Sequence, residues 1–266
     1  MPSRDKLHES QGLLHQVLEK ALAMSISVAK RNDVLFVTLN AGPKGNRLSN
    51  ASAIKLAELL ETAVEERLVV LASEGPEFCV GRDFGGSPDR WTDLSAVEVR
   101  ERNTEPVLRM LAAIRRSRMP VMTVVQGKAI GVGVSIAAVS DMAIASDAAA
   151  FQLPEMDHGI PPCLVMSALA GRILPQAIMQ MVYSNEAIDA ARARDIGIVS
   201  DVVPAPGLQA RVDEMVARIA SQPIRAVRAV KEYMRSAPGM DAQGAADFAS
   251  SLLAGVLSSP SPRAAT

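Results

Sequence analysis

The chain of 266 residues is 48% apolar, which is enough for one sizeable core, and its formal net charge at pH 7 is −1 with a pI near 6.3. A charge balance so close to zero argues against a nucleic-acid-binding surface, because such a surface needs a concentrated basic face. The two cysteines, Cys79 and Cys163, are too few for a disulfide framework and favour a reducing cytoplasm. No apolar stretch reaches the roughly 18 residues of a membrane-spanning helix. We therefore expect a cytoplasmic protein with neither a membrane nor a nucleic-acid partner.

Residues 1–24 are predicted to be a leader that precedes the folded core. Asp5, Glu9 and Glu19 interrupt this segment, so it fits neither a secretory signal nor an acid-poor transit peptide. A short amphipathic helix or an irregular chain is the simpler interpretation. We expect the core over residues 25–206 and a helical region over residues 207–266.

Strands and helices alternate along the predicted core. Asn32 and Asp33 divide residues 25–40 into the two strands of a hairpin. Residues 50–66 follow the period of a helix, and residues 67–73 read as a short strand that is apolar on both faces, as in a parallel sheet. The later elements are expected in this order: a helix over 105–117, a strand over 120–126, a small-residue helix over 134–140, a strand over 141–146, a helix over 161–174, and a helix followed by a strand over 189–204. This order predicts a layered α/β core with a C-terminal helical extension.

Two glycine-containing turns follow apolar strands, in "FCVGRDFGG" (78–86) and "QGKAIGVGVSIAAVSD" (126–141). Backbone N–H groups at such turns can point at an acceptor, and two of them could hold one developing negative oxygen. A carboxylate nearby could then move a proton, and Glu155 in "FQLPEMDHGIPP" (151–162) is the candidate. Taken singly, Gly131 and Gly133 also fit tight helix packing, and Glu155 also fits a simple cap. The second turn is no dinucleotide fingerprint, because Ile136 occupies the position of the third glycine.

These segments together resemble the crotonase superfamily, the enoyl-CoA hydratases and isomerases. The resemblance rests on "VTLN…PKGNRLS", "LASEGPEFCVGRDF", "VQGKAIGVGVSIAAVSDMAIAS", "FQLPEMDHGI" and "ARDIGIVSDVVP", in this order, and covers roughly residues 26–235. It implies a spiral of strand–strand–helix turns, with C-terminal helices that build homotrimers, often paired into hexamers. It also implies a coenzyme A thioester as substrate, no permanently bound cofactor and no metal.

The resemblance also implies a role for individual residues. The N–H groups of Arg82 and Val132 would form an oxyanion hole for the thioester oxygen, although relatives usually carry a small residue and a glycine there. Glu155 would be the acid/base. The residues expected to contact coenzyme A are Lys44, Arg47, Asp83, Phe84 and Lys231.

The sequence departs from the hydratase pattern at its carboxylates. Relatives that hydrate use two glutamates, whereas this chain has Ser135 at the first of the two positions and Glu155 at the second. Serine has no useful acidity near neutral pH, although its hydroxyl could orient a water. Dienoyl isomerases add an aspartate where this chain has Cys163. Asp157 and His158 are possible secondary groups, although neighbouring residues on a strand face opposite ways, so Glu155 and His158 need not converge.

Two classes of function stay open from the sequence. The first is an acyl-CoA enzyme of the enoyl-CoA hydratase/isomerase type that stabilises a thioester enolate, with a hydrolase as a variant on the same scaffold. The second is a non-catalytic acyl-CoA-binding scaffold that lost the first hydratase glutamate. In relatives the segment equivalent to residues 86–105 sets acyl-chain selectivity, and Trp91 lies within it.

Overall fold

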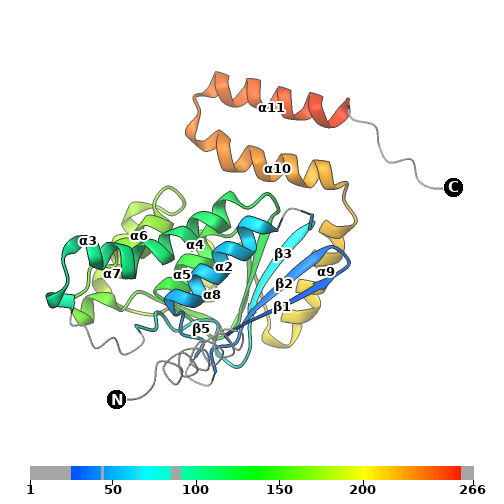
Figure 1. Ribbon diagram of the computed structural model, residues 1–266. Coiled ribbons are helices and arrows are strands. Elements are labelled where there is room, and N and C mark those ends of the chain that lie inside the picture. The colour runs from blue at the N-terminus through cyan, green and yellow to red at the C-terminus, as the bar shows by residue number, and fades with distance from the viewer. Residues whose placement is uncertain (1–24, 43–44, 64, 85–90, 259–266) are drawn as a thin grey trace, which may run out of the picture.

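The computed structural model describes residues 25–42, 45–63, 65–84 and 91–258, and in it helices surround two β-sheets (Figure 1). The larger sheet has the strand order β1-β2-β3-β4-β6-β9 and the smaller one β5-β7-β8. The strands are β1 Ile26–Arg31, β2 Val34–Leu39, β3 Leu68–Ser73, β4 Val121–Val125, β5 Lys128–Ile130, β6 Met142–Ser146, β7 Ala150–Gln152, β8 Ile188–Asp189 and β9 Asp201–Val203. From β2 to β9 all neighbours in the larger sheet are parallel.

The helices follow the expected order along the chain. The α-helices are α2 Asn50–Thr62, α3 Ala96–Val99, α4 Glu105–Arg116, α5 Val132–Val139, α6 Cys163–Leu169, α7 Pro175–Ser184, α8 Ala190–Asp195, α9 Leu208–Ala220, α10 Ile224–Ser236 and α11 Ala242–Leu257. Short 3₁₀ helices lie at η1 Trp91–Asp93, η3 Glu155–His158, η4 Ala205–Gly207 and η5 Ala237–Gly239, and η2 Arg100–Thr104 is a π-helix.

The first hairpin confirms the expectation from Asn32 and Asp33. Their φ angles are +48° and +62°, and two left-handed residues in succession are what a tight two-residue hairpin turn requires. β1 and β2 pair in the antiparallel sense from Ile26↔Leu39 to Arg31↔Val34.

The rest of the core repeats one unit. β4 enters the larger sheet, β5 enters the smaller sheet and α5 follows; β6, β7 and α6 repeat this order. Each repeat adds a parallel strand beside the previous one, β6 beside β4 and β7 beside β5. The predicted α/β spiral of strand–strand–helix turns with C-terminal helices is confirmed.

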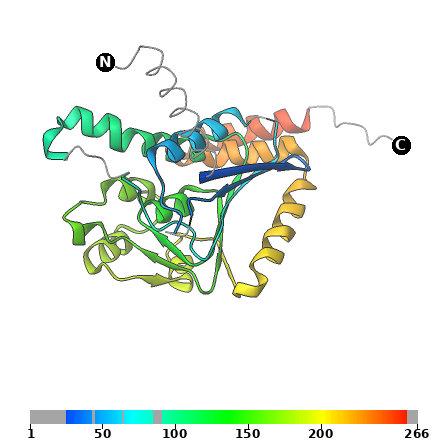
Figure 2. The ribbon, with the colours of Figure 1, turned by 60° about the horizontal axis from the view of Figure 1, so that its bottom comes forward.

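β3 confirms the prediction of a strand that is apolar on both faces. Val69 and Leu71 belong to the main core, with α2, α4 and α5, whereas Leu68 and Val70 pack on the other face with Val212 of α9. In Figure 2 α9 (yellow) lies to one side of the strands and the green helices lie to the other. Burial on both faces is typical of parallel strands.

Three differences from the prediction concern the site region. α5 begins at Val132, two residues earlier than expected, directly after the turn at Gly131. The helix after the two prolines begins at Cys163, so Pro162 caps it and is not part of its first turn. Residues 155–158 form the 3₁₀ helix η3.

The C-terminal helices divide into two groups. α9 packs on the larger sheet, whereas α10 and α11 form a hairpin that extends beyond the core (Figure 1). Lys231 is the buried residue of α10, and α11 has no buried residue. Within the described residues no helix combines the length and the apolar character needed to cross a membrane. The predicted leader, residues 1–24, lies outside the described residues.

Candidate active site

The two glycine turns lie side by side. The N–H of Cys79 donates to the carbonyl of Lys128 (3.1 Å), and the N–H of Ile130 donates to the carbonyl of Cys79 (2.8 Å). Gly133 makes this contact possible, because a Cβ there would stand 2.5 Å from the carbonyl oxygen of Cys79. The segment before the first turn is therefore held against the segment that leads into α5.

Both proposed donor amides are available. Leu48 donates to the carbonyl of Gly81 and accepts from the N–H of Asp83, so Arg82 lies between these two bonds and its own N–H points away from Leu48. Val132 is the first residue of α5, where N–H groups have no acceptor within the helix. In the described part of the chain, neither N–H has a protein acceptor.

Glu155 lies against the second turn. The N–H of Gly131 donates to the carbonyl of Gln152 at the end of β7, which brings η3 to the start of α5. The Oε1 atom of Glu155 lies 2.5 Å from the point that a Cβ on Gly131 would occupy. Burial raises the pKa of the Glu155 carboxyl, while its own backbone N–H and the charge of His158 act in the lowering direction. Its Oε2 atom is buried and has no hydrogen-bond partner. The carboxyl group is thus half desolvated beside Gly131, the residue before Val132.

The three secondary candidates differ in their surroundings. The buried Ser135 hydroxyl faces the carbonyl of Gly131 at 3.5 Å, one turn back along α5. Asp157 is exposed and accepts a hydrogen bond from the side chain of Asn185. His158 is also exposed, but because residues three apart eclipse in a 3₁₀ helix, it lies on the same side as Glu155. In a strand these two side chains need not converge, whereas the 3₁₀ helix turns them to the same side.

Three of the predicted CoA contacts lie around the first turn. Arg47 is exposed and donates to the carbonyl of Arg82 at 3.4 Å. Asp83 and Phe84 follow directly in the chain and are exposed. Lys44 lies outside the described residues.

Lys231 lies away from the first glycine turn. Its ammonium group is 4% exposed and forms an ion pair with Asp141 at 2.7 Å, and it also donates to the carbonyl of Ile114 at 3.3 Å. Asp141 follows the C-terminus of α5, whereas both candidate amides and Glu155 lie at the N-terminal side of that helix. The structure therefore does not bring Lys231 together with the other predicted CoA contacts within one chain.

Sequence reasoning missed Asn46. Its side chain is buried, accepts from the N–H of Ala41 (3.0 Å) and donates to the carbonyls of Glu74 (2.7 Å) and Glu77 (2.9 Å). It ties Ala41 and the Asn46 backbone to the turn that precedes Phe78. Its φ of +55° is a conformation that asparagine tolerates better than most residues, and the Gly-Asn pair in "PKGNRLS" is the signal that could have revealed it.

The cysteines and carboxylates do not form another centre. Cys79 is fully buried, which raises the pKa of its thiol to about 11, and Cys163 is exposed at the start of α6. Among the described residues no group of three or more His, Cys, Asp or Glu side chains is placed to hold a metal ion.

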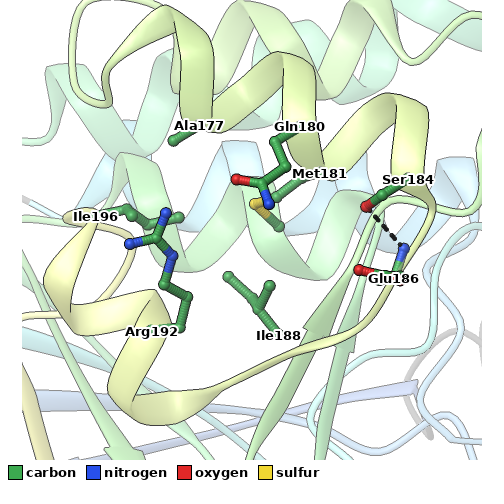
Figure 3. A pocket seen from close by; sticks show the side chains of 8 residues that line it. All are labelled: Ala177, Gln180, Met181, Ser184, Glu186, Ile188, Arg192 and Ile196. Atoms are coloured by element: carbon green, nitrogen blue, oxygen red, sulfur yellow. Dashed lines mark hydrogen bonds between the residues drawn. The ribbon is translucent and has the colours of Figure 1, made fainter.

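A small hollow between α7, β8 and α8 is distinct from this site (Figure 3). Its volume is about 40 Å³, far below the several hundred Å³ of typical ligand pockets. Arg192 and Glu186 stand on its rim around an apolar wall that includes Met181, and neither Glu155 nor the two glycine turns line it. It is too small for an acyl-CoA.

A glutamate beside two adjacent glycine turns, within a strand–strand–helix repeat, is the arrangement implied by the resemblance to the crotonases. A family model described as enoyl-CoA hydratase/isomerase matches residues 29–260. The chain belongs to this family. Its general activity is therefore the processing of acyl-CoA thioesters.

Relatives of the chain carry hydratase names. It is 31% identical over 214 residues to (E)-benzylidenesuccinyl-CoA hydratase of Thauera aromatica, covering 79% of this chain and 81% of the relative. It is 29% identical over 212 residues to 2,3-dehydroadipyl-CoA hydratase of Escherichia coli, covering 78% and 80%. The enoyl-CoA hydratase structure from Mycobacterium smegmatis matches with a TM-score of 0.82 at 26% identity, over 89% of this chain and 92% of that one. A putative enoyl-CoA hydratase from Thermobifida fusca, solved with CoA, shares the fold (TM-score 0.79, 24% identity, 90% and 95% coverage).

Proposed function

We propose that this enoyl-CoA hydratase/isomerase family member moves a double bond along the acyl chain of an enoyl-CoA, with Glu155 as its single proton carrier. The observation that carries the proposal is the position of Glu155, whose half-desolvated carboxyl lies against Gly131 and whose Oε2 has no protein partner. Burial raises the pKa of that carboxyl and so makes its ionised form a stronger base.

The reaction needs one base and one oxyanion hole. The thioester oxygen of a 3-enoyl-CoA would accept hydrogen bonds from the N–H groups of Arg82 and Val132. Glu155 would take a proton from C2, and the electron pair would spread from C4 through C2 to the thioester oxygen, where the two amides stabilise it. Glu155 would then return the same proton to C4, which leaves a 2-enoyl-CoA and regenerates the carboxylate.

The serine at position 135, where hydratases carry their first glutamate, supports isomerisation over hydration. Hydration by two glutamates needs a base on one side of a water and an acid on the other, and Ser135 takes the first of these positions. The Ser135 hydroxyl faces a backbone carbonyl, and Asp157 bonds to Asn185. Of the charged side chains in the described residues, His158 is the one whose charge acts on Glu155.

Hydration of a 2-enoyl-CoA is the second candidate, and it is supported by the hydratase names of the relatives. Hydrolysis of an acyl-CoA bond and binding without turnover remain as outcomes of the same test. The three outcomes differ in what the assay detects: hydration consumes the enoyl absorbance, hydrolysis releases a carboxylic acid, and a scaffold changes nothing.

The test is to incubate the purified protein with 3-hexenoyl-CoA and, separately, with crotonyl-CoA, and to follow the enoyl thioester absorbance. The proposal predicts appearance of absorbance with the first substrate and none or little loss with the second. Loss of absorbance from crotonyl-CoA alone would replace isomerisation by hydration if the thioester stays intact, and by hydrolysis if a carboxylic acid and free CoA are released. Silence with both, together with measurable CoA affinity, would replace it by a binding role, and Glu155→Gln would then change nothing.

We also infer that the α10–α11 hairpin docks on further copies of the chain to give a trimer or hexamer. An open apolar groove of about 310 Å³ runs between these helices, lined by Ala226, Ala229, Val230, Tyr233, Met234, Ala249, Leu252, Leu253 and Val256. Val230, Met234 and Leu253 are each at least 60% exposed in the single chain. Apolar faces of this kind on an otherwise polar surface are typical of subunit interfaces.

A further inference from the structure

The Arg82 side chain has a role that its backbone does not explain. One terminal nitrogen, Nη1, donates to the carbonyl of Asn103 at 2.6 Å, and the other, Nη2, donates to Oδ1 of Asn50 at 2.6 Å. Asn103 lies in the π-helix η2 and Asn50 is the first residue of α2. A side chain that starts at the oxyanion-hole turn therefore joins two elements that are far apart in the sequence.

Asn50 closes this connection from the other side. Its Nδ2 donates to the carbonyl of Arg102 at 2.5 Å while its Oδ1 accepts from Arg82. Two consecutive carbonyls of η2, those of Arg102 and Asn103, are thus held by two side chains. π-helices are rare and occur often at functional sites.

An aromatic pair extends the contact to the start of the same segment. The guanidinium of Arg82 lies over the ring of Phe84, 5.1 Å from its centroid, and Phe84 meets Trp91 edge to face with 5.0 Å between centroids. Trp91 is the single tryptophan of the chain. Arg82 therefore contacts the end of the segment 91–104 directly, through Asn103, and its start through Phe84.

The charge of Arg82 also indicates a structural role for its side chain. Within the described residues its hydrogen-bond partners are neutral oxygens, and no carboxylate pairs with it. Burial is the cause that lowers the pKa of its guanidinium, and its Nε is buried without a partner. Holding a half-buried cation without a counter-ion costs free energy, so its two short bonds must offset that cost.

We infer that the Arg82 side chain is a positioning residue that clamps segment 91–104 to the start of α2 and thereby shapes the acyl side of the site. The effect on the acyl side rests on the proposed function, whereas the connection between segment 91–104 and α2 does not. The N–H of Arg82 would stabilise the oxyanion, and its side chain fixes the wall beside it. Any variant of the side chain keeps the backbone donor, which separates the two roles.

The structural test uses Arg82→Met and Asn50→Ala, which break the clamp from opposite ends. Both variants should shift Trp91 fluorescence to longer wavelength and speed amide exchange over residues 91–104 by about tenfold or more. The double variant should add little to either single one, because both remove the same connection. Arg100→Met is the matched control: Arg100 lies in the same segment, its side chain is 73% exposed, and its carboxylate partner is Glu105. Unchanged fluorescence and exchange in both clamp variants would overturn the inference.

The functional test compares acyl lengths, with 3-hexenoyl-CoA and 3-dodecenoyl-CoA as substrates. Arg82→Met and Asn50→Ala should each raise KM for the longer substrate about tenfold more than KM for the shorter one, and Asn50→Ala should leave kcat for the shorter substrate within about twofold of the wild type. Arg82→Lys should recover only part of the loss seen in Arg82→Met, because an ammonium group cannot span both acceptors. An equal loss for both lengths would overturn the role in shaping the acyl side. If the wild-type protein turns over neither substrate, the proposed function fails. The role of the clamp is then tested by whether Arg82→Met weakens the affinity for dodecanoyl-CoA more than the affinity for hexanoyl-CoA.

Discussion

The Glu155 carboxyl and the Gly131 Cα are packed so closely that no side chain fits between them: a Cβ on Gly131 would stand 2.5 Å from Oε1 of Glu155. Gly131→Ala should therefore displace the carboxylate and reduce kcat/KM by about 100-fold, the cost of misplacing a catalytic group by roughly 1 Å. Steady-state kinetics with the substrate identified above would measure this loss.

The matched control for this change is Gly171→Ala. Both glycines have a positive φ, +54° and +77°, so either alanine strains the backbone, and the strain is greater at Gly131 because its ψ of −110° lies outside the left-handed region. Around Gly171 nothing lies within 4 Å of the added Cβ. Equal activity losses in the two variants would mean that strain, and not the contact with Glu155, explains the effect.

Glu155→Gln should remove activity while making the protein more stable. General-base catalysis contributes about 10²–10⁴-fold, and an amide cannot supply it. The folded state raises the pKa of Glu155, so the stability that this group contributes is fully present below its unfolded pKa and is lost as the pH rises through its folded pKa. Above that range the variant should melt higher than the wild type by roughly a few degrees, a difference that should vanish near pH 4. Thermal melts at several pH values would measure it, and a variant that melts lower at pH 8 would contradict the desolvation of Glu155.

The pH profile of activity should report the same group. Because a base must be ionised, kcat/KM should fall as the pH drops through the Glu155 pKa, and this limb should lie above 4.5, the usual value of a glutamate. His158 acts to lower the pKa of Glu155, so His158→Gln should move the limb to higher pH without abolishing activity. A limb that stays in place would mean that the two side chains do not interact in solution.

The elements that depend on local residue preferences could be predicted well from the sequence. Asn32 and Asp33 carry the hairpin in their own backbone preferences, and the unbroken apolar run of β3 indicates burial on both faces. Residues 155–158 were harder, because the 3₁₀ turn between Pro154 and the left-handed Gly159 has no apolar period to read. That turn places the Glu155 and His158 side chains on the same side of η3.

Side-chain contacts between residues far apart in the chain could not be predicted from the sequence. The family resemblance predicted a CoA contact for Lys231, but its partner Asp141 lies 90 residues away and meets it only through the packing of α10 on the core. Asn50 and Asn103 meet Arg82 in the same way. Side chains that join distant elements leave no periodic pattern, so only coordinates identify them.

The ion pair between the buried Lys231 and the partly exposed Asp141 makes a prediction that separates anchoring from CoA binding. Lys231→Met leaves the Asp141 carboxylate without its cation and should lower the free energy of unfolding by about 1–2 kcal/mol, less than for a fully buried pair because water reaches Asp141. Adding Asp141→Asn should restore part of this loss, because it removes the unpaired charge. Urea unfolding would measure both effects. Unchanged stability combined with a weaker CoA affinity would instead restore the predicted CoA contact.

The exposed apolar face of the α10–α11 hairpin should hold subunits together. Val230→Glu and Leu253→Glu place a charge in the groove where a second copy would have to desolvate it, so each should shift the assembly toward the monomer. Light scattering after size-exclusion chromatography would give the mass. Ser251→Glu is the matched control, since Ser251 is exposed on α11 and does not line the groove. A wild-type chain that is already monomeric at micromolar concentration, or a control that dissociates as readily as the two groove variants, would remove this face from the assembly. The groove would then lie open to solvent, and its cost in exposed apolar area would need another explanation.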